Sequence, residues 1–373
     1  MDTDRSAFVN RERLQRRLRE NRLDGLLVLG AENVAYLSGY YVPNLRLMPY
    51  RVHAVLWPAA GEPAFIVPAT RIHPATHIAD VRQYPRDGWV PAPVIAEAVR
   101  DRGLARARLG IDKRTCPLWH FEALSKALPD VRFDDGSDLL HEVRMVKTPA
   151  EVDLLRGAAE ATQAAMVAAL RQTRSGDTEA DVASRMAAHL LAGGAGGVAF
   201  TVVLFGARGS LPDPEVDPTA RLAPGMGIRL DIGGLYGGYY SDVARVAVLG
   251  EASERQRSVY GRLQEIQRKA IAAIRPGVAA SDIYGVVERA YRAAGLEMRW
   301  GTFGHGVGLS IHERPYIMAR ETDALETGMV LAIEPGYAEM GVDGYHVEDV
   351  VVVTATGCEV LGEHPGVQGL LQV

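Results

Sequence analysis

Four carboxylates lie at the ends of apolar, strand-like segments in the second half of the chain: Asp231, Asp242, Glu334 and Glu348. Glu334 follows Asp231 by 103 residues, and Glu348 follows Asp242 by 106. An isolated acidic residue of this kind would be interpreted as an exposed turn residue. Four at equivalent places in two similar segments are expected to meet, and buried carboxylates that meet need cations to stay ionised.

A histidine flanked by glycines, His305, lies in the segment FGHGVGLSIHERP of residues 303–315. The glycines allow the backbone to pass close to another group. A histidine alone would more often be a core residue. Together with four carboxylates, however, it makes a hard, oxygen-rich ligand set that suits two divalent cations such as Mn²⁺, Co²⁺, Fe²⁺ or Zn²⁺.

The elements that must position these residues are predicted to occur twice. Capping-box sequences at Thr148 and Ser253 each begin a long helix. Each long helix is followed by a glycine-containing turn and a second helix, over residues 178–191 and 281–294, and then by strand-like hairpins that carry the carboxylates. We therefore predict two α/β halves related by a pseudo-two-fold axis, with the four carboxylates at its centre.

The first part of the chain has a different pattern. Leu14 and Leu18 give one apolar face to a basic helix, and short apolar segments such as residues 26–29 and 64–67 predict strands. With 373 residues the chain exceeds the size of a single core. We predict an α/β (α+β) protein with an N-terminal domain over residues 1–146 and a C-terminal domain over residues 147–373.

Composition excludes several classes of protein. The chain has 41 Lys+Arg and 46 Asp+Glu, and its net charge of −5 argues against a dedicated nucleic-acid surface. Its sequence contains neither an apolar segment long enough to span a bilayer nor a signal peptide, so a cytoplasmic location is predicted. Two cysteines cannot form a disulfide framework.

Taken together, the motifs resemble those of the pita-bread metallopeptidases, which include methionine aminopeptidase, aminopeptidase P and prolidase. The motifs are Asp231-Ile-Gly, Ser241-Asp242-Val-Ala-Arg245, Gly304-His305-Gly-Val-Gly-Leu with His312-Glu313, Ile333-Glu334-Pro-Gly and Val347-Glu348-Asp. The segments Gly25-Leu-Leu-Val and Asn33-Val-Ala-Tyr-Leu-Ser-Gly39 are similar to the N-terminal domain shared by Xaa-Pro peptidases and creatinase. The resemblance covers the whole chain.

The resemblance implies a role for each matching residue. The implied metal ligands are Asp231, Asp242, His305, Glu334 and Glu348, with Asp242 and Glu348 bridging two divalent ions. These ions would lower the pKa of a water molecule so that it attacks an amide carbonyl. Glu334 would also transfer the proton to the leaving nitrogen, and His312 would contact the substrate or its developing oxyanion. The resemblance further implies a homodimer.

Three positions depart from the pattern of Xaa-Pro peptidases. His346 stands where these enzymes usually have an arginine, and an imidazole cannot reproduce a guanidinium fork. Asp213 takes the place of a substrate-facing histidine, and Phe200 that of a tyrosine. Together with His312, these three residues are the predicted substrate contacts.

The expected function is that of a metal-dependent Xaa-Pro dipeptidase, similar to prolidase, that cleaves the bond before proline in short peptides. One alternative is another C–N hydrolase with the same fold, similar to creatinase or ectoine hydrolase. Another is a peptide-binding relative without catalysis. Creatinase lacks the metal-ligand set, and non-catalytic relatives generally lose ligands, so the five residues favour the peptidase.

Overall fold

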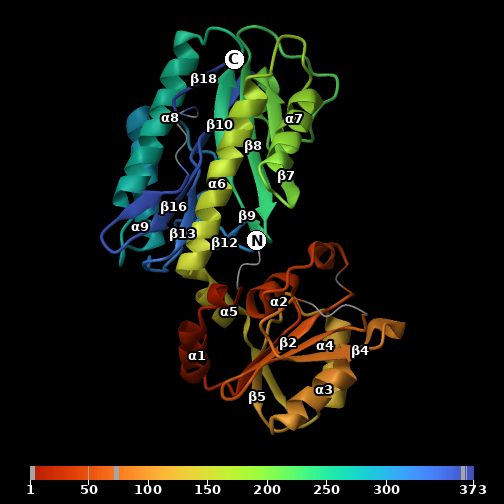
Figure 1. Cartoon of the computed structure of the whole chain (residues 1–373). Helices are drawn as coiled ribbons and strands as arrows, with labels where there is room; N and C mark the ends of the chain where they lie inside the picture. The colour runs from red at the N-terminus through yellow and green to blue at the C-terminus, as the bar shows by residue number, and fades with distance from the viewer. Residues whose placement is uncertain (1–4, 49, 71–74, 363–365, 367) are drawn as a thin grey trace. The chain divides into compact units, whose positions relative to one another are not determined.

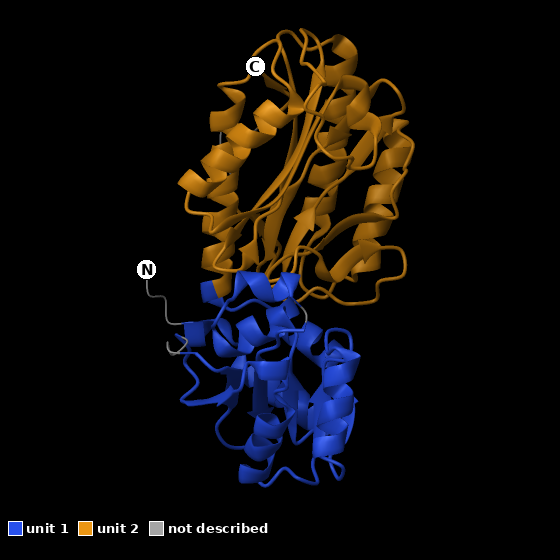
Figure 2. Cartoon of the chain, turned by 90° about the vertical axis from the view of Figure 1, so that its right-hand side faces the viewer, with its two compact units in different colours: residues 1–150 blue, residues 151–373 orange. Residues whose placement is uncertain are grey.

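The computed structural model describes residues 5–48, 50–70, 75–362, 366 and 368–373 (Figure 1). The chain divides into two compact units, Met1–Ala150 (unit 1) and Glu151–Val373 (unit 2), coloured separately in Figure 2. Among the helices within the described ranges, none combines the length and apolar character that a bilayer span requires.

Unit 1 consists of a mixed β-sheet and the helices around it. The strands are β1 (Gly25–Val28), β2 (Ala54–Pro58), β3 (Ala64–Pro68), β4 (Asp80–Tyr84), β5 (Arg108–Ile111) and β6 (Arg132–Asp135), and they lie in the order β4-β3-β2-β1-β5-β6. The helices are α1 (Arg11–Glu20), α2 (Ala31–Ser38), α3 (Ala92–Asp101), α4 (Leu118–Ala127) and α5 (Ser137–Met145), with 3₁₀ turns η1 (Arg5–Phe8), η2 (Pro43–Leu47) and η3 (Asp87–Trp89).

The core of unit 1 lies where α3 and α4 pack against the sheet. Ile95 and Val99 of α3 are buried with Leu124 of α4 against Leu56 of β2 and Leu109 of β5. Strand β1 is buried along its whole length and pairs antiparallel with β2 but parallel with β5. The succession of helix-like and apolar strand-like segments in this region therefore predicts the α/β fold that the structure has.

The described residues of unit 2 form two five-stranded sheets, a two-stranded sheet of β14 and β15, and two pairs of long helices. Its helices are α6 (Pro149–Leu170), α7 (Glu179–Ala192), α8 (Glu254–Ala273) and α9 (Ala280–Ala294), with the 3₁₀ turn η4 (Gly206–Ser210). Its strands are β7 (Gly197–Phe205), β8 (Gly227–Tyr236), β9 (Tyr239–Tyr240), β10 (Val243–Val248), β11 (Thr302–Gly306), β12 (Glu313–Met318), β13 (Val330–Ile333), β14 (Gly336–Glu339), β15 (Asp343–His346), β16 (Asp349–Val353), β17 (Cys358–Val360) and β18 (Leu371–Gln372). The two main sheets have the orders β18-β10-β8-β7, with β9 beside β8, and β12-β11-β13-β16-β17.

Each five-stranded sheet of unit 2 is covered by its own helix pair, as Figure 1 shows. Met166 of α6 and Met186 of α7 are buried against Leu230 of β8 in the first half. In the second half, the ring of Tyr291 on α9 lies 5.3 Å from that of Phe303 on β11. The helix pair α6 and α7 thus covers the sheet that contains β8, and the pair α8 and α9 covers the sheet that contains β11.

Hydrogen bonds outside the helices and strands also occur in equivalent pairs. The N–H of Gly176 donates to the carbonyl of Leu222 at 2.8 Å. At the corresponding place in the second half, the N–H of Gly277 donates to the carbonyl of Leu325, also at 2.8 Å. The predicted mixed α/β fold with two duplicated halves is therefore confirmed.

Candidate metal centre

The five predicted ligands lie within strands or directly beside strand ends of unit 2. Asp231 lies within β8, opposite Ala244 of β10. Asp242 directly precedes β10, Glu334 directly follows β13, and Glu348 directly precedes β16. His305 lies in β11, which pairs with β13. Each half therefore supplies two carboxylates from equivalent hairpins, and the second half also supplies the imidazole.

The structure brings these side chains within reach of shared cations. Nε2 of His305 lies 3.7 Å from Oδ2 of Asp242 and 3.4 Å from Oε1 of Glu334. Donor atoms lie within 4.8 Å of one another in three groups, which are Asp242 with His305 and His312, Asp231 with His346 and Glu348, and His305 with Glu334 and Glu348. Because the groups share His305 and Glu348, they form one continuous cluster.

Several donor atoms in this cluster have no hydrogen-bond partner among the described residues. They are Oδ1 of Asp231, both carboxylate oxygens of Glu348 and Nδ1 of His346, and all are buried. Leaving a buried polar atom unpaired costs about 1–3 kcal/mol. Cations would satisfy these lone pairs together, so the residues present fit a divalent-metal centre.

Burial disfavours the charged forms of four of the five predicted ligands, Asp231, Asp242, Glu348 and His305. Burial, with a smaller contribution from neighbouring carboxylates, raises the pKa of Asp231 to about 6. Burial and then nearby carboxylates raise the pKa values of Asp242 and Glu348 well above the ordinary range. Burial lowers the pKa of His305 to about 4, so its imidazole is neutral at pH 7 and has a free lone pair. A bound cation would favour the ionised form of these carboxylates and so lower their pKa values.

Comparison with known families agrees with this geometry. Residues 153–355 match metallopeptidase family M24, and residues 10–146 match the creatinase/prolidase N-terminal domain. The chain belongs to metallopeptidase family M24. It is therefore a hydrolase of a family that uses divalent metal ions, and the predicted resemblance to the pita-bread enzymes is confirmed.

Relatives match the M24 chain along most of its length. It is 34% identical over 343 residues to the probable dipeptidase PepE of Mycobacterium tuberculosis, covering 90% of this chain and 88% of the relative. It is 30% identical to the Xaa-Pro dipeptidase of Lactobacillus delbrueckii subsp. lactis, covering 94% and 95%. The solved structure of the Xaa-Pro dipeptidase from Bacillus anthracis superimposes with a TM-score of 0.85 at 26% identity, covering 97% and 98%.

The predicted substrate contacts of the M24 chain lie in different surroundings. His312 is exposed, and its ring centroid lies 3.9 Å from that of His305. Asp213 forms an ion pair with Arg229, and its side chain is 61% exposed. Phe200 packs against Gly233, where a Cβ atom would overlap its ring. The roles of Asp213 and Phe200 in substrate binding stay predictions.

Two arginines that the sequence analysis did not assign position the cluster of this M24 chain. Buried Arg245 donates hydrogen bonds to the carbonyls of Ala244, at 2.9 Å, and of Glu348, and it forms an ion pair with Asp349. Arg245 thereby links β10 of the first half to β16 of the second. Buried Arg229 donates to the carbonyl of Leu211 at 2.9 Å and holds the loop after η4 beside β8. Arg245 is a lone charge in the apolar strand β10, and Arg229 lies two residues before Asp231 in β8. A charge within such an apolar strand is the signal that could have identified each arginine.

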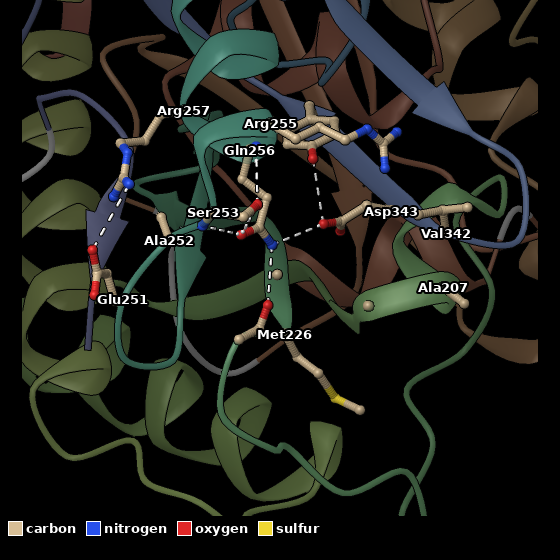
Figure 3. A pocket seen from close by; sticks show the side chains of 14 residues that line it. Ala207, Met226, Glu251, Ala252, Ser253, Arg255, Gln256, Arg257, Val342 and Asp343 are labelled. Carbon is tan, nitrogen blue, oxygen red and sulfur yellow. Dashed lines mark hydrogen bonds and ion pairs between the residues drawn. The ribbon is translucent and has the colours of Figure 1, made fainter.

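A hollow of about 600 Å³ lies beside the N-terminus of α8 (Figure 3), and none of the predicted ligands lines it. Here Nε2 of Gln256 donates to Asp343, the first residue of β15, at 3.2 Å. Gln256 also completes the capping box that the sequence predicts at Ser253. The start of α8 thus anchors one end of β15, and the other end of β15 is His346.

Proposed function

We propose that this M24 chain is a metal-dependent Xaa-Pro dipeptidase that hydrolyses the peptide bond before proline in short peptides. The observation that carries the proposal is the cluster of four carboxylates and an imidazole, in which buried oxygens of Asp231 and Glu348 have no hydrogen-bond partner among the described residues. The relatives named Xaa-Pro dipeptidase support the substrate class.

Two divalent ions, drawn from Mn²⁺, Co²⁺, Zn²⁺ and Fe²⁺, are proposed for the centre. Their ligands would be Asp231, Asp242, His305, Glu334 and Glu348. Once bound, such ions supply Lewis acidity, which makes water a stronger nucleophile and polarises the scissile carbonyl. We also propose that the protein acts as a homodimer in the cytoplasm.

Glu334 is suited to transfer the proton. Its side chain is 21% exposed, compared with 5% for Asp242, so it is more accessible to a substrate. Burial acts to raise the pKa of Glu334, but a hydrogen bond with His346 lowers it, and the net shift leaves the pKa below its ordinary value. Glu334 is therefore a carboxylate that can accept a proton from the attacking water and donate it to the leaving nitrogen.

His312 is suited to contact the substrate. It is exposed, whereas the neighbouring His305 is buried, and the two rings are in contact. A donor at this place can stabilise the negative charge that develops on the carbonyl oxygen during attack. We assign His312 to the substrate and His305 to the metal.

A hydrolysis panel tests the proposal. Metal-stripped protein and protein reloaded with Mn²⁺, Co²⁺ or Zn²⁺ would be given Xaa-Pro dipeptides, Xaa-Pro-Xaa tripeptides, creatine and ectoine. We expect metal-dependent cleavage of the Xaa-Pro dipeptides. Turnover by fully stripped protein would refute the mechanism, and cleavage of creatine or ectoine alone would favour the alternative C–N hydrolase.

A further inference from the structure

His346 lies among the proposed ligands rather than at their edge. It is the last residue of β15 and is buried, with 6% of its surface exposed. Its Nδ1 atom lies 3.6 Å from Oδ2 of Asp231, and its Nε2 atom lies 3.4 Å from Oε2 of Glu334. The imidazole therefore contacts one carboxylate from each half of unit 2.

The unpaired buried atoms of the cluster belong to one group of three residues. Asp231, His346 and Glu348 each contribute at least one atom without a hydrogen-bond partner in the described ranges, and their donor atoms lie within 4.8 Å of one another. Nitrogen and oxygen ligands lie about 2.0–2.2 Å from a cation such as Zn²⁺, so two ligands of one ion are at most about 4 Å apart. The separation of 3.6 Å between His346 and Asp231 meets this condition.

We propose that Nδ1 of His346 is a sixth protein ligand of the centre and coordinates the ion held by Asp231 and Glu348. The inference rests on the proposed metal-dependent function. A single tautomer satisfies both neighbours, because an N–H at Nε2 points to Glu334 while Nδ1 keeps its lone pair for the ion.

The surroundings of His346 fix its ring in place. Gly336 of β14 lies opposite His346 in the β14–β15 pair, and a Cβ atom at Gly336 would overlap the ring of Trp300. The Trp300 ring centroid lies 6.3 Å from that of His346. Asp343, at the far end of β15, is held by the N-terminus of α8. Strand β15, which carries His346, is therefore anchored by β14 along its length and by α8 at its first residue.

The alternative role for His346 is that of a positive charge in place of the arginine usual at this position. The two roles differ chemically, because a guanidinium has no lone pair and cannot bind a metal. A second imidazole also makes the centre richer in nitrogen, which favours Zn²⁺, Co²⁺ or Fe²⁺ over Mn²⁺.

The test counts the imidazoles bound to metal in the full-length protein. Wild type and the variants His346→Arg and His346→Gln would be loaded with Co²⁺, checked for folding by thermal melting, and compared by elemental analysis, calorimetry and X-ray absorption spectroscopy. We expect wild type to show two imidazoles per centre, and both variants to show one and to bind Co²⁺ on the order of 10–100-fold more weakly. His312→Gln is the matched control and should retain two.

Several results would overturn the inference. These are a single imidazole in wild type, an unchanged count in both His346 variants, loss of an imidazole in His312→Gln instead, or Co²⁺ binding by His346→Arg as tight as in wild type. The same experiment distinguishes failure of the proposed function from failure of this inference. Two imidazoles in a protein that cleaves no Xaa-Pro peptide would refute the function alone, and Xaa-Pro cleavage with one imidazole would refute only the role of His346.

Discussion

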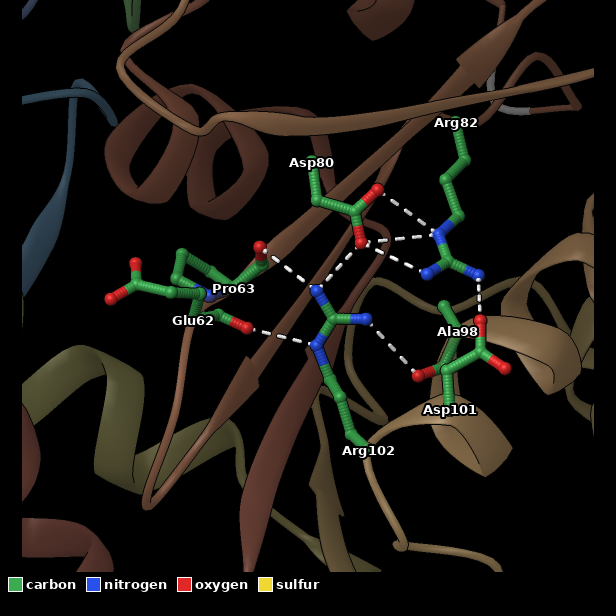
Figure 4. A network of polar contacts seen from close by, with 7 residues as sticks. All are labelled: Glu62, Pro63, Asp80, Arg82, Ala98, Asp101 and Arg102. Carbon is green, nitrogen blue, oxygen red and sulfur yellow. Dashed lines mark hydrogen bonds and ion pairs between the residues drawn. The ribbon is translucent and has the colours of Figure 1, made fainter.

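The two units each contain a cluster of charged side chains, and the clusters are compensated in opposite ways. In unit 1, Asp80 of β4 accepts hydrogen bonds from Arg82 and Arg102, and Arg82 also pairs with Asp101 at 2.7 Å (Figure 4). Burial acts to raise the pKa of Asp80, but the two guanidinium groups together lower it below the ordinary value. This cluster contains its own cations.

The cluster of unit 2 also contains carboxylates, but within the described ranges they are not hydrogen-bonded to arginine side chains as Asp80 is. Asp231, Asp242 and Glu348 face other carboxylates and imidazoles, and their pKa values are raised. The comparison shows that residue type alone does not separate a structural ion-pair network from a metal centre. The raised pKa values of Asp231, Asp242 and Glu348, together with the unpaired buried atoms, separate them.

Removing Asp242 or Glu348, the carboxylates predicted to bridge two ions, should have the largest effect. We expect Asp242→Ala or Glu348→Ala to abolish turnover and to weaken metal binding by more than about 100-fold, because even residues that only support a ligand cost 10–100-fold. Elemental analysis and calorimetry would measure the loss. Asp80→Ala is the control from the compensated cluster and should leave metal content unchanged. Full metal occupancy in Asp242→Ala would contradict the bridging assignment.

Removing His312 should slow the reaction but spare the metal. We expect His312→Ala to retain the metal content of wild type and to lose about 100-fold in kcat, which corresponds to about 2.7 kcal/mol of transition-state stabilisation. Steady-state kinetics and elemental analysis would be measured on the same samples. A variant that loses metal along with activity would move His312 into the ligand set.

Neutralising Asp231 should stabilise the metal-free protein at neutral pH. The folded pKa of Asp231 is about 6 and the ordinary value is 3.8. Between these values the folded state keeps a proton that the unfolded state has lost, so stability falls as pH rises through this window. After metal is removed with a chelator, the free energy of unfolding of Asp231→Asn should therefore equal that of wild type near pH 4. At pH 7 it should exceed the wild-type value by about 2–3 kcal/mol, as measured by urea unfolding.

The control is the same urea unfolding measurement on metal-loaded wild type and Asp231→Asn. Once both proteins are loaded, wild type should be the more stable, because binding to the folded state adds stability and the variant has lost a ligand. An Asp231→Asn variant that is less stable than wild type without metal would show that the carboxylate is compensated within the protein.

Removing Asp80 should have the smallest effect of the four. Its side chain is 33% exposed, and ion pairs in such surroundings contribute little. We expect Asp80→Ala to lower the free energy of unfolding by about 1 kcal/mol, and Glu297→Ala, at a 70% exposed pair with Arg299, by less than about 0.5 kcal/mol. Urea unfolding at pH 7 measures both. Equal losses would show that the network of unit 1 adds nothing beyond a single surface pair.

The sequence predicts most of the fold because its patterns are local. The capping box at Ser253, the apolar helix faces and the strand-like hairpins each specify an element without long-range information. The similar spacings of Asp231 with Glu334, 103 residues, and of Asp242 with Glu348, 106 residues, then indicate the duplication. These residues also carry the family resemblance, so the proposed ligand set follows from the sequence.

The rest of the site depends on contacts between segments far apart in the chain. Arg245 and Glu348 are 103 residues apart, and nothing local in the sequence pairs them. Asp213 illustrates the same limit, because its pairing with Arg229 depends on the conformation of a loop. The sequence predicts His346 as a substrate contact that replaces an arginine, whereas its contacts with Asp231 and Glu334 emerge when β8 and β15 come together.

The link between β10 and β16 has a consequence for how unit 2 holds together. Glu348 donates its N–H to the carbonyl of Ala244 at 3.0 Å, and Arg245 reaches back across the same seam. Around this seam the two repeats bring carboxylates that repel each other until they share an ion. Metal loading would then act as a cross-link that joins two repeats into one cooperative folding unit, and slower amide exchange in both repeats would accompany a single loading event.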